Sequence, residues 1–113
     1  MNKIIEKSLK QKIERLEAFE ERLHVKLENI SIKVEEGNWF SLFCELYPLN
    51  GTKIKSNIIV ECILYDIEGS IMQLTSNWID SENFFGFEVL EFSFPEEGII
   101  DKVGKIRIYP KKN

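Results

Sequence analysis

The spacing of apolar residues changes near residue 24, and this change predicts two kinds of structure. Before residue 24, apolar residues recur at steps of three or four, which places them on one helix face: Ile5, Leu9, Ile13, Leu16, Phe19 and Leu23. Neither glycine nor proline interrupts this segment. The pattern predicts one amphipathic helix over residues 3–23, within an N-terminal unit of residues 1–24.

After residue 24, apolar residues recur at every second position, which is typical of half-buried strands. The alternating runs cover residues 25–34, 40–46, 58–65, 71–74, 84–94 and 103–109. The first run changes phase near Asn29, and turn residues separate several runs, as in Pro95-Glu96-Glu97-Gly98. We therefore expect a mainly β protein in which residues 25–113 form an antiparallel, immunoglobulin- or fibronectin-like β-sandwich of six to seven strands.

The segment Asp66-Ile67-Glu68-Gly69 has three possible interpretations: a calcium loop, half of an acid–base pair, or a hairpin turn. A calcium loop needs oxygen ligands at further alternate positions, and the residues that follow are mostly apolar. Asp and Gly are favoured in tight turns, because Asp bonds its own backbone and Gly accepts a positive φ. We expect a hairpin here, followed by a polar loop over residues 75–83 around Trp78.

The same region carries a resemblance to a known family. Cys62-Ile63-Leu64-Tyr65-Asp66, followed by Glu68-Gly69, resembles the FxLYD-type domains, which are small bacterial and archaeal β-sandwich modules. The resemblance extends over about residues 28–110, and the closing K-I-R-I-Y-P (105–110) is similar to uncharacterised bacterial sandwich domains. The sequence departs from the motif at its first position, where Cys62 replaces the expected Phe. The resemblance implies a sandwich fold and no activity.

Charge is unevenly distributed along the 113 residues, whose formal net charge is −4. Residues 35–101 contain 13 acidic side chains and only two basic ones, Lys53 and Lys55, a local balance of −11. Because this acidic region repels the phosphate backbone of nucleic acids, we expect no nucleic-acid partner. The sequence contains no apolar run of membrane-spanning length and no secretory signal, so we expect no membrane association and a cytoplasmic location.

Candidate chemistry is sparse. His24 is the only histidine and has no nucleophile near it in the sequence, and the neighbouring carboxylates are explained by chance among 19 acidic residues. Cys44 and Cys62 fall on the apolar phase of their runs, which favours buried thiols over a disulfide between neighbouring strands. We expect no enzyme activity, no cofactor and no metal site.

These observations favour a non-catalytic interaction or assembly module. The N-terminal apolar stripe must be buried, either on its own sheet, against a second copy in a homodimer, or on a different protein. The alternative is a ligand-binding module for carbohydrate or a peptide strand, with a site at Trp78, Asp80 and Asn83.

Overall fold

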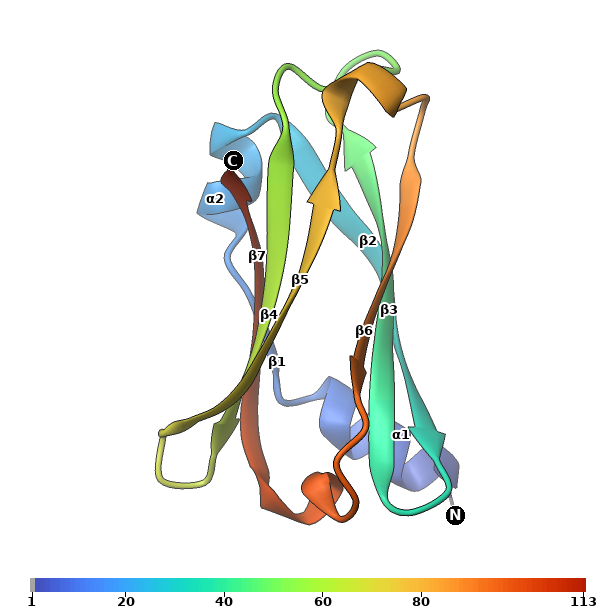
Figure 1. Ribbon diagram of the computed structural model, residues 1–113, viewed down its shortest axis with the longest axis vertical. Helices are drawn as coiled ribbons and strands as arrows, with labels where there is room; N and C mark the ends of the chain where they lie inside the picture. Colours follow the sequence, from blue (N-terminus) through green and yellow to red (C-terminus); the bar gives the residue numbers. More distant parts are fainter. Residues whose placement is uncertain (1) are drawn as a thin grey trace.

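Two facing β-sheets form the computed structural model, which describes residues 2–113 (Figure 1). The four-stranded sheet has the order β1 (Ile13–Arg15), β7 (Val103–Lys112), β4 (Ile58–Asp66), β5 (Ile71–Ile79). The three-stranded sheet has the order β2 (Val25–Glu35), β3 (Trp39–Pro48), β6 (Glu88–Phe94). All pairs are antiparallel except β1 with β7, which is parallel. The predicted mainly β, two-sheet architecture is confirmed.

The core lies between the sheets and is built from the alternation seen in the sequence. Phe40 and Leu42 of β3 pair with Phe94 and Phe92 of β6, and all four side chains are fully buried. The two cysteines are also buried, and both are free thiols. Burial raises the pKa of Cys44 to about 12 and also raises the pKa of Cys62, so neither thiol forms a reactive thiolate near neutral pH.

The prediction of one helix over residues 3–23 is wrong. The segment forms helix α1 (Asn2–Lys10), strand β1 and helix α2 (Glu17–Arg22). The break occurs because the backbone on both sides of β1 bonds to β7: the Ile106 amide donates to the Lys12 carbonyl at 3.0 Å, and the Leu16 amide donates to the Ile108 carbonyl at 3.4 Å. Tertiary strand pairing here overrides a helical spacing of apolar residues. No helix in residues 2–113 is long and apolar enough to cross a membrane.

The six residues of the predicted helix stripe are consequently divided among three elements and their connections. Leu9 is buried in the core, and Ile5, Ile13 and Leu23 are partly buried against it. Leu16 precedes α2, and Phe19 packs its ring edge-to-face on Tyr109 of β7, with centroids 5.6 Å apart. The continuous helix face required for helix-mediated dimerisation is therefore absent from the structure.

The expected hairpin at Asp66 is confirmed, and it connects β4 to β5. One carboxylate oxygen of Asp66 accepts hydrogen bonds from the amides of Glu68 and Ser70, both at 2.9 Å. Gly69 has a φ of 90°, a conformation that a residue without Cβ adopts at little cost. The phase change near Asn29 is also confirmed, as a register shift between Glu28 and Ser31 in the β2–β3 pair.

The predicted loop over residues 75–83 is wrong in its first half. Strand β5 continues to Ile79, and only then does the chain turn through a short 3₁₀ helix, η1 (Ser81–Asn83). The polar residues misled the sequence interpretation because β5 is an edge strand, where polar side chains are tolerated on both faces. Strand β6 begins at Glu88, later than residue 84, and a second 3₁₀ helix, η2 (Ile99–Lys102), leads into β7.

Candidate functional site

One side of the sandwich is covered by the N-terminal segment, residues 2–24. Strand β2 is the edge of its sheet, and two carboxylates accept hydrogen bonds from its outward amides: Glu6 from Val34 and Glu20 from Leu27, each at 3.0 Å. On the other sheet, β1 pairs with β7 and completes that edge. On this side, carboxylates or an added strand therefore occupy the backbone groups with which another chain could pair.

The pair formed by Arg15 and Glu20 joins the two sheets on this covered side. Arg15 donates two hydrogen bonds to the Glu20 carboxylate, at 2.6 and 3.1 Å, and a third to the Leu27 carbonyl at 2.6 Å. The Glu20 side chain is only 4% exposed, whereas that of Arg15 is 34% exposed. Because every hydrogen-bonding group of this buried carboxylate has a partner, the pair has a structural role.

The opposite side of the sandwich is formed by the edge strands β5 and β6, which contact each other across the gap between the sheets. Nine large apolar side chains are exposed in residues 2–113, and six of them lie on β5 or on and just before β6: Ile71, Leu74, Trp78, Phe85, Phe87 and Val89. Strand β6 carries Glu88 and Glu91, whereas β5 contains no charged residue in nine positions. Because 30% of the residues in the chain are charged, about three charged residues would be expected in a strand of this length.

The outward backbone of β5 has no partner within residues 2–113. Its backbone hydrogen bonds are those of the β4–β5 ladder, and no side chain in this range bonds to its outer edge. The Asn77 side chain instead donates to the Glu91 carbonyl of β6 at 2.8 Å, which ties the two sheets together. We call the outer edge of β5, with the exposed side chains of Ile71, Leu74 and Trp78, the open β5 edge.

Of the three predicted contact residues, Trp78 belongs to this edge and the other two do not. Trp78 is 66% exposed and pairs with Ile59 of β4. Asp80 begins η1, and its carboxylate accepts from the Glu82 amide at 3.0 Å and from the Asn83 side chain at 2.7 Å. Asp80 and Asn83 therefore stabilise a turn, and no hydrogen bond within residues 2–113 links either residue to Trp78.

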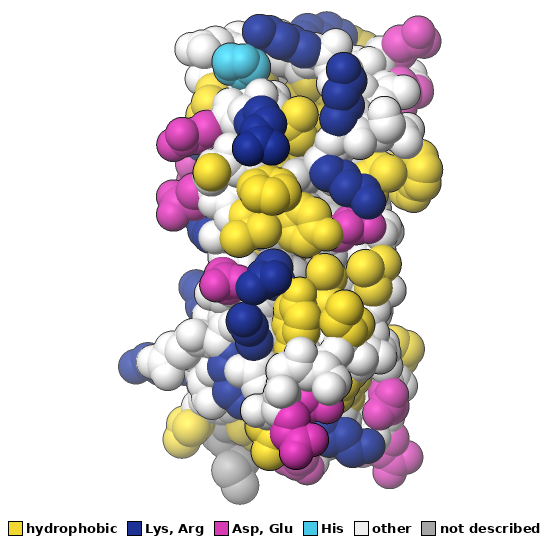
Figure 2. Space-filling view, turned by 90° about the vertical axis from the view of Figure 1, so that its left-hand side faces the viewer, with side chains coloured by type: hydrophobic (Ala, Val, Ile, Leu, Met, Phe, Trp, Pro, Cys, Tyr) yellow, Lys and Arg dark blue, Asp and Glu magenta, His cyan; other side chains and the backbone are white. Residues whose placement is uncertain are grey.

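The outer face of the four-stranded sheet is shown in Figure 2, where hydrophobic side chains in the middle are interspersed with charged ones. Its most buried carboxylate is Glu61, which accepts from the Tyr109 hydroxyl at 2.6 Å and lies 3.3 Å from the Lys111 amine. The hydrogen bond lowers the pKa of Glu61 and raises the pKa of Tyr109 to about 12. This carboxylate is therefore held ionised, and it is engaged by two neighbours.

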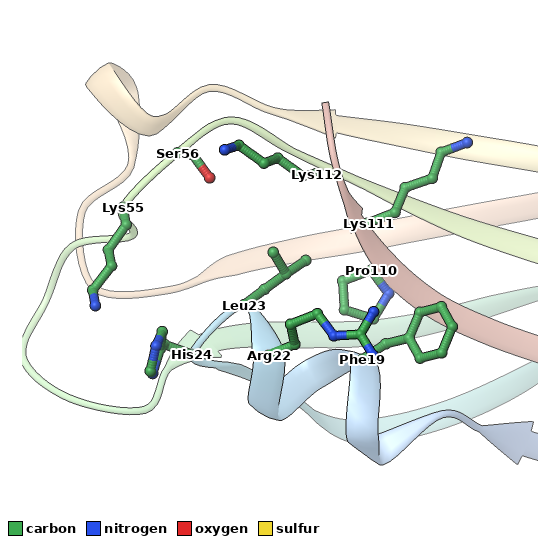
Figure 3. Close-up of a pocket in the computed structure, with 9 residues that line it drawn as sticks. All are labelled: Phe19, Arg22, Leu23, His24, Lys55, Ser56, Pro110, Lys111 and Lys112. Carbon is green, nitrogen blue, oxygen red and sulfur yellow. The ribbon is translucent and has the colours of Figure 1, made fainter.

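Near one end of this face lies a basic pocket of about 510 Å³, between α2, the β3–β4 connection and the end of β7 (Figure 3). Its apolar lining consists of Phe19, Leu23 and Pro110. The polar and charged lining residues are Arg22, His24, Lys55, Ser56, Lys111 and Lys112. None of the lining residues is acidic, although the chain as a whole is. Figure 2 shows the single histidine near the upper end of the molecule with basic side chains around it.

The sequence alone does not reveal this pocket, because its residues come from three segments that are far apart in the chain. One signal was available. Lys53 and Lys55 are the only basic residues between Glu35 and Asp101, and Lys55 lines the pocket, while Lys53 lines a smaller adjoining cavity with His24. Within residues 2–113, no group of three or more His, Cys, Asp or Glu side chains is arranged to hold a metal ion.

Comparisons with known proteins indicate the fold alone. No protein-family model matches the sequence, and no curated protein matches it significantly. The structure is similar to a DUF1425 family member from Shewanella sp. pv-4, with a TM-score of 0.52 and 11% identity over 79% of this chain and 78% of that one. A weaker likeness is to the uncharacterized lipoprotein yajI from Escherichia coli, with a TM-score of 0.39 and 14% identity over 78% of this chain and 55% of that one. The resemblance to FxLYD-type domains stays a prediction, and the chain is similar to solved β-rich proteins of low sequence identity.

Proposed function

We propose that this protein is a non-catalytic interaction and assembly module, in which the open β5 edge pairs with the same edge of a second copy. The observation that carries the proposal is the composition of β5, nine residues without a charge or a proline, with Trp78 exposed. Edge strands of natural proteins usually carry charges, prolines or bulges that prevent such pairing. The one register shift of β5 lies beside the hairpin, between the pairs Tyr65–Ile71 and Leu64–Gln73, and the register is regular from Gln73 to Ile79. This regular stretch lacks charge and proline, which suits it to strand addition.

A second copy is the partner that the charges favour. Two β5 strands related by a twofold axis bring no like charges together, whereas two β6 strands would oppose their glutamates. Leu74 and Trp78 lie on the same face of β5 and flank the added strand with apolar surface. The predicted homodimer is thus retained, and its surface moves from the N-terminal stripe to β5.

The non-catalytic part of the proposal is supported by the state of the candidate groups. Both thiols are buried with raised pKa values, and the most buried carboxylate of the outer face is already hydrogen-bonded to Tyr109. A cytoplasmic location, predicted from the sequence, remains part of the proposal.

The finer classification of the sandwich is also a proposal. If β2, β3, β4, β5, β6 and β7 are equated with strands A, B, C, C′, E and F, the sheets have the orders A-B-E and C′-C-F, as in immunoglobulin-like folds. Strand β1 then lies beside F, where strand G would pair, and runs parallel to it. This correspondence supports an immunoglobulin- or fibronectin-like type.

The test is the solution mass, measured by light scattering over a range of protein concentrations. We expect a dimer that the double variant Leu74→Lys, Trp78→Lys converts to a folded monomer. The matched control is Ile4→Lys, Leu49→Lys, which adds the same charge at exposed apolar positions away from β5 and should remain dimeric. A wild-type monomer at all concentrations, or equal loss of the dimer in the control, would overturn the proposal.

A further inference from the structure

We propose that the basic pocket binds a small organic phosphate, a soluble molecule with a phosphate group and an apolar portion. The site is separate from the open β5 edge and does not depend on self-association. Four observations support it: the unpaired cations, the absence of acidic lining residues, the apolar lining, and the fixation of the segments that form the pocket.

The charge of the pocket is not balanced by the protein. Lys111 lies 3.3 Å from Glu61, and Figure 3 shows its amine pointing away from the other lining residues. Arg22, Lys55 and Lys112 form no ion pair within residues 2–113. Three positive charges around one cavity repel each other unless an anion neutralises them. Because a phosphate monoester carries close to two negative charges at pH 7, it balances them better than a single carboxylate does.

The types of donor also suit phosphate. A lysine amine contacts phosphate oxygens as a compact charge, and a guanidinium presents two parallel N–H groups to them. Ser56 adds a neutral hydroxyl at the wall of the pocket, which can donate to a further oxygen.

The size and apolar lining indicate an organic portion on the ligand. A cavity of about 510 Å³ falls within the range of roughly 300–1,000 Å³ that is usual for small-molecule sites, and it is far larger than one phosphate ion requires. Phe19, Leu23 and Pro110 supply apolar surface beside the cations. A ligand that fills the pocket therefore places its phosphate among the cations and an apolar group against Leu23 and its neighbours.

Burial, hydrogen bonds and a cation–π contact hold the segments that carry the cations in place. Ile54 anchors the β3–β4 connection in the core beside Lys55. At the end of this connection, the Asn57 side chain accepts from the Ser81 amide at 2.8 Å, and the Asn57 carbonyl accepts from the Asn113 amide at 3.2 Å. The Arg22 guanidinium lies over the Phe19 ring, 5.3 Å from its centroid. Walls that are already ordered lose little entropy when a ligand binds.

The acidic remainder of the protein restricts the anion to a small one. A cleft lined by one sign of charge concentrates counter-ions locally even when the net charge of the protein has the same sign as the ligand. A long polyanion such as nucleic acid would extend beyond the cations and meet the acidic surface. The expectation that nucleic acid does not bind is therefore compatible with this site.

The experiment is a titration of the full chain, labelled with ¹⁵N, with phenyl phosphate at low ionic strength. We expect saturable shifts of the amide signals of Leu23, Ser56 and Lys112, with a dissociation constant on the order of 1 mM or below. Inorganic phosphate and benzoate are the comparison probes, the first without the apolar group and the second with a single charge. Each should bind about tenfold more weakly than phenyl phosphate.

The variant Lys55→Ala, Lys112→Ala removes two of the unpaired cations and should weaken binding at least about tenfold. Its matched control is Lys7→Ala, Lys33→Ala, which removes the same charge from exposed lysines outside the pocket and should change affinity less than about twofold. Thermal unfolding of both variants, monitored by circular dichroism, verifies that they are folded, as expected for exposed side chains.

Three results would overturn the proposal: no saturable shift with phenyl phosphate, equal binding by the Lys55→Ala, Lys112→Ala variant, or equal binding of benzoate. If inorganic phosphate binds as tightly as phenyl phosphate, the apolar lining does not contribute and the organic part of the proposal is wrong.

Discussion

The edge strands on the two sides of the sandwich differ in whether their outward backbone groups have partners within residues 2–113. On one side, residues 2–24 satisfy the outward backbone of β2 with the Glu6 and Glu20 carboxylates and pair β7 with β1. On the other side, β5 has no charged residue and three exposed apolar side chains, and no segment within residues 2–113 covers its outer edge. Unpaired edge groups must bond to water, to a side chain or to another strand. The N-terminal segment of this chain therefore prevents strand pairing at two edges, whereas the β5 edge stays available to a partner.

The largest effect is expected from removing the covering segment. A chain that begins at Leu23 lacks Leu9 from the core, β1 from the edge of β7, and the Arg15–Glu20 pair. We expect the free energy of unfolding to fall by about 5 kcal/mol or more, a large part of the roughly 5–15 kcal/mol typical of a domain. Urea denaturation followed by circular dichroism measures it. A chain that begins at Ile4 is the control, with a change below about 1 kcal/mol, and an unchanged urea midpoint in the longer truncation would contradict the role of the segment.

The next effect is expected from Glu20→Ala. The substitution removes the acceptor of the Leu27 amide and two of the three hydrogen bonds of the Arg15 guanidinium, which keeps only its bond to the Leu27 carbonyl. Breaking a fully buried pair costs about 3–5 kcal/mol, and because Arg15 is one-third exposed we expect a loss of about 2–3 kcal/mol in urea denaturation. Glu17→Ala, at an exposed position of the same helix, should change stability by less than about 0.5 kcal/mol. Similar stability of the two variants would show that β2 does not need this acceptor.

A smaller, pH-dependent effect is expected on the outer face between the two sides. Tyr109→Phe removes the hydrogen bond to Glu61 and should cost about 1 kcal/mol at pH 7. Folding raises the pKa of Tyr109 to about 12, so its contribution is complete below pH ~10, the pKa of an unfolded tyrosine, and is lost as the pH rises through about 12. Folding lowers the pKa of Glu61, so its contribution is present above pH ~4.5 and is lost as the pH falls through the lowered pKa.

The measurement is the stability difference between Tyr109→Phe and wild type, determined by urea denaturation from acid to alkaline pH. A plateau between these limits, with a decrease at both ends, is the expected profile. The half-buried pair of Tyr47 and Glu45, whose hydrogen bond is longer at 3.1 Å, serves as the comparison, and Tyr47→Phe should have a smaller effect across the same range. A pH-independent difference for Tyr109→Phe would show that the Glu61 bond does not depend on ionisation.

The smallest loss of stability is expected from a substitution at the open β5 edge. Trp78→Ala should change the stability of the monomer by less than about 1 kcal/mol, because the side chain is 66% exposed. Its neighbour Ile79 is 1% exposed and points into the core, so Ile79→Ala should cost about 2–5 kcal/mol. Both are measured by thermal and urea denaturation. A large loss in Trp78→Ala would indicate that this residue belongs to the fold and is not free for a partner.

Local chemistry accounts for the features that sequence analysis predicted correctly. The hairpin at Asp66 depends on a carboxylate that bonds amides two and four residues later, and Gly69 accepts the positive φ, so four adjacent residues suffice. The phase change near Asn29 is likewise contained in the alternation of β2. Where adjacent residues supply both the hydrogen bonds and the conformational preference, the sequence is a sufficient guide.

The errors arose where a distant strand decides the structure. Ile13 and Leu16 have helical spacing relative to their neighbours, but the backbone between them bonds to β7, more than 90 positions away in sequence. Residues 75–79 look like a loop because their polarity suits an edge position, which only the pairing with β4 establishes. Local periodicity contains no information on which edge is unoccupied.

By itself, the sequence determined a mainly β chain with an apolar alternation, its turn chemistry and an acidic middle, because each depends on residue types at short spacing. Only the tertiary structure decided which strands lie at the edges and which of those edges are covered. It also brought Arg22, Lys55 and Lys112 to one pocket from three separate segments. These features depend on the docking of distant segments through backbone hydrogen bonds and burial, and such contacts leave no periodic signal along the chain.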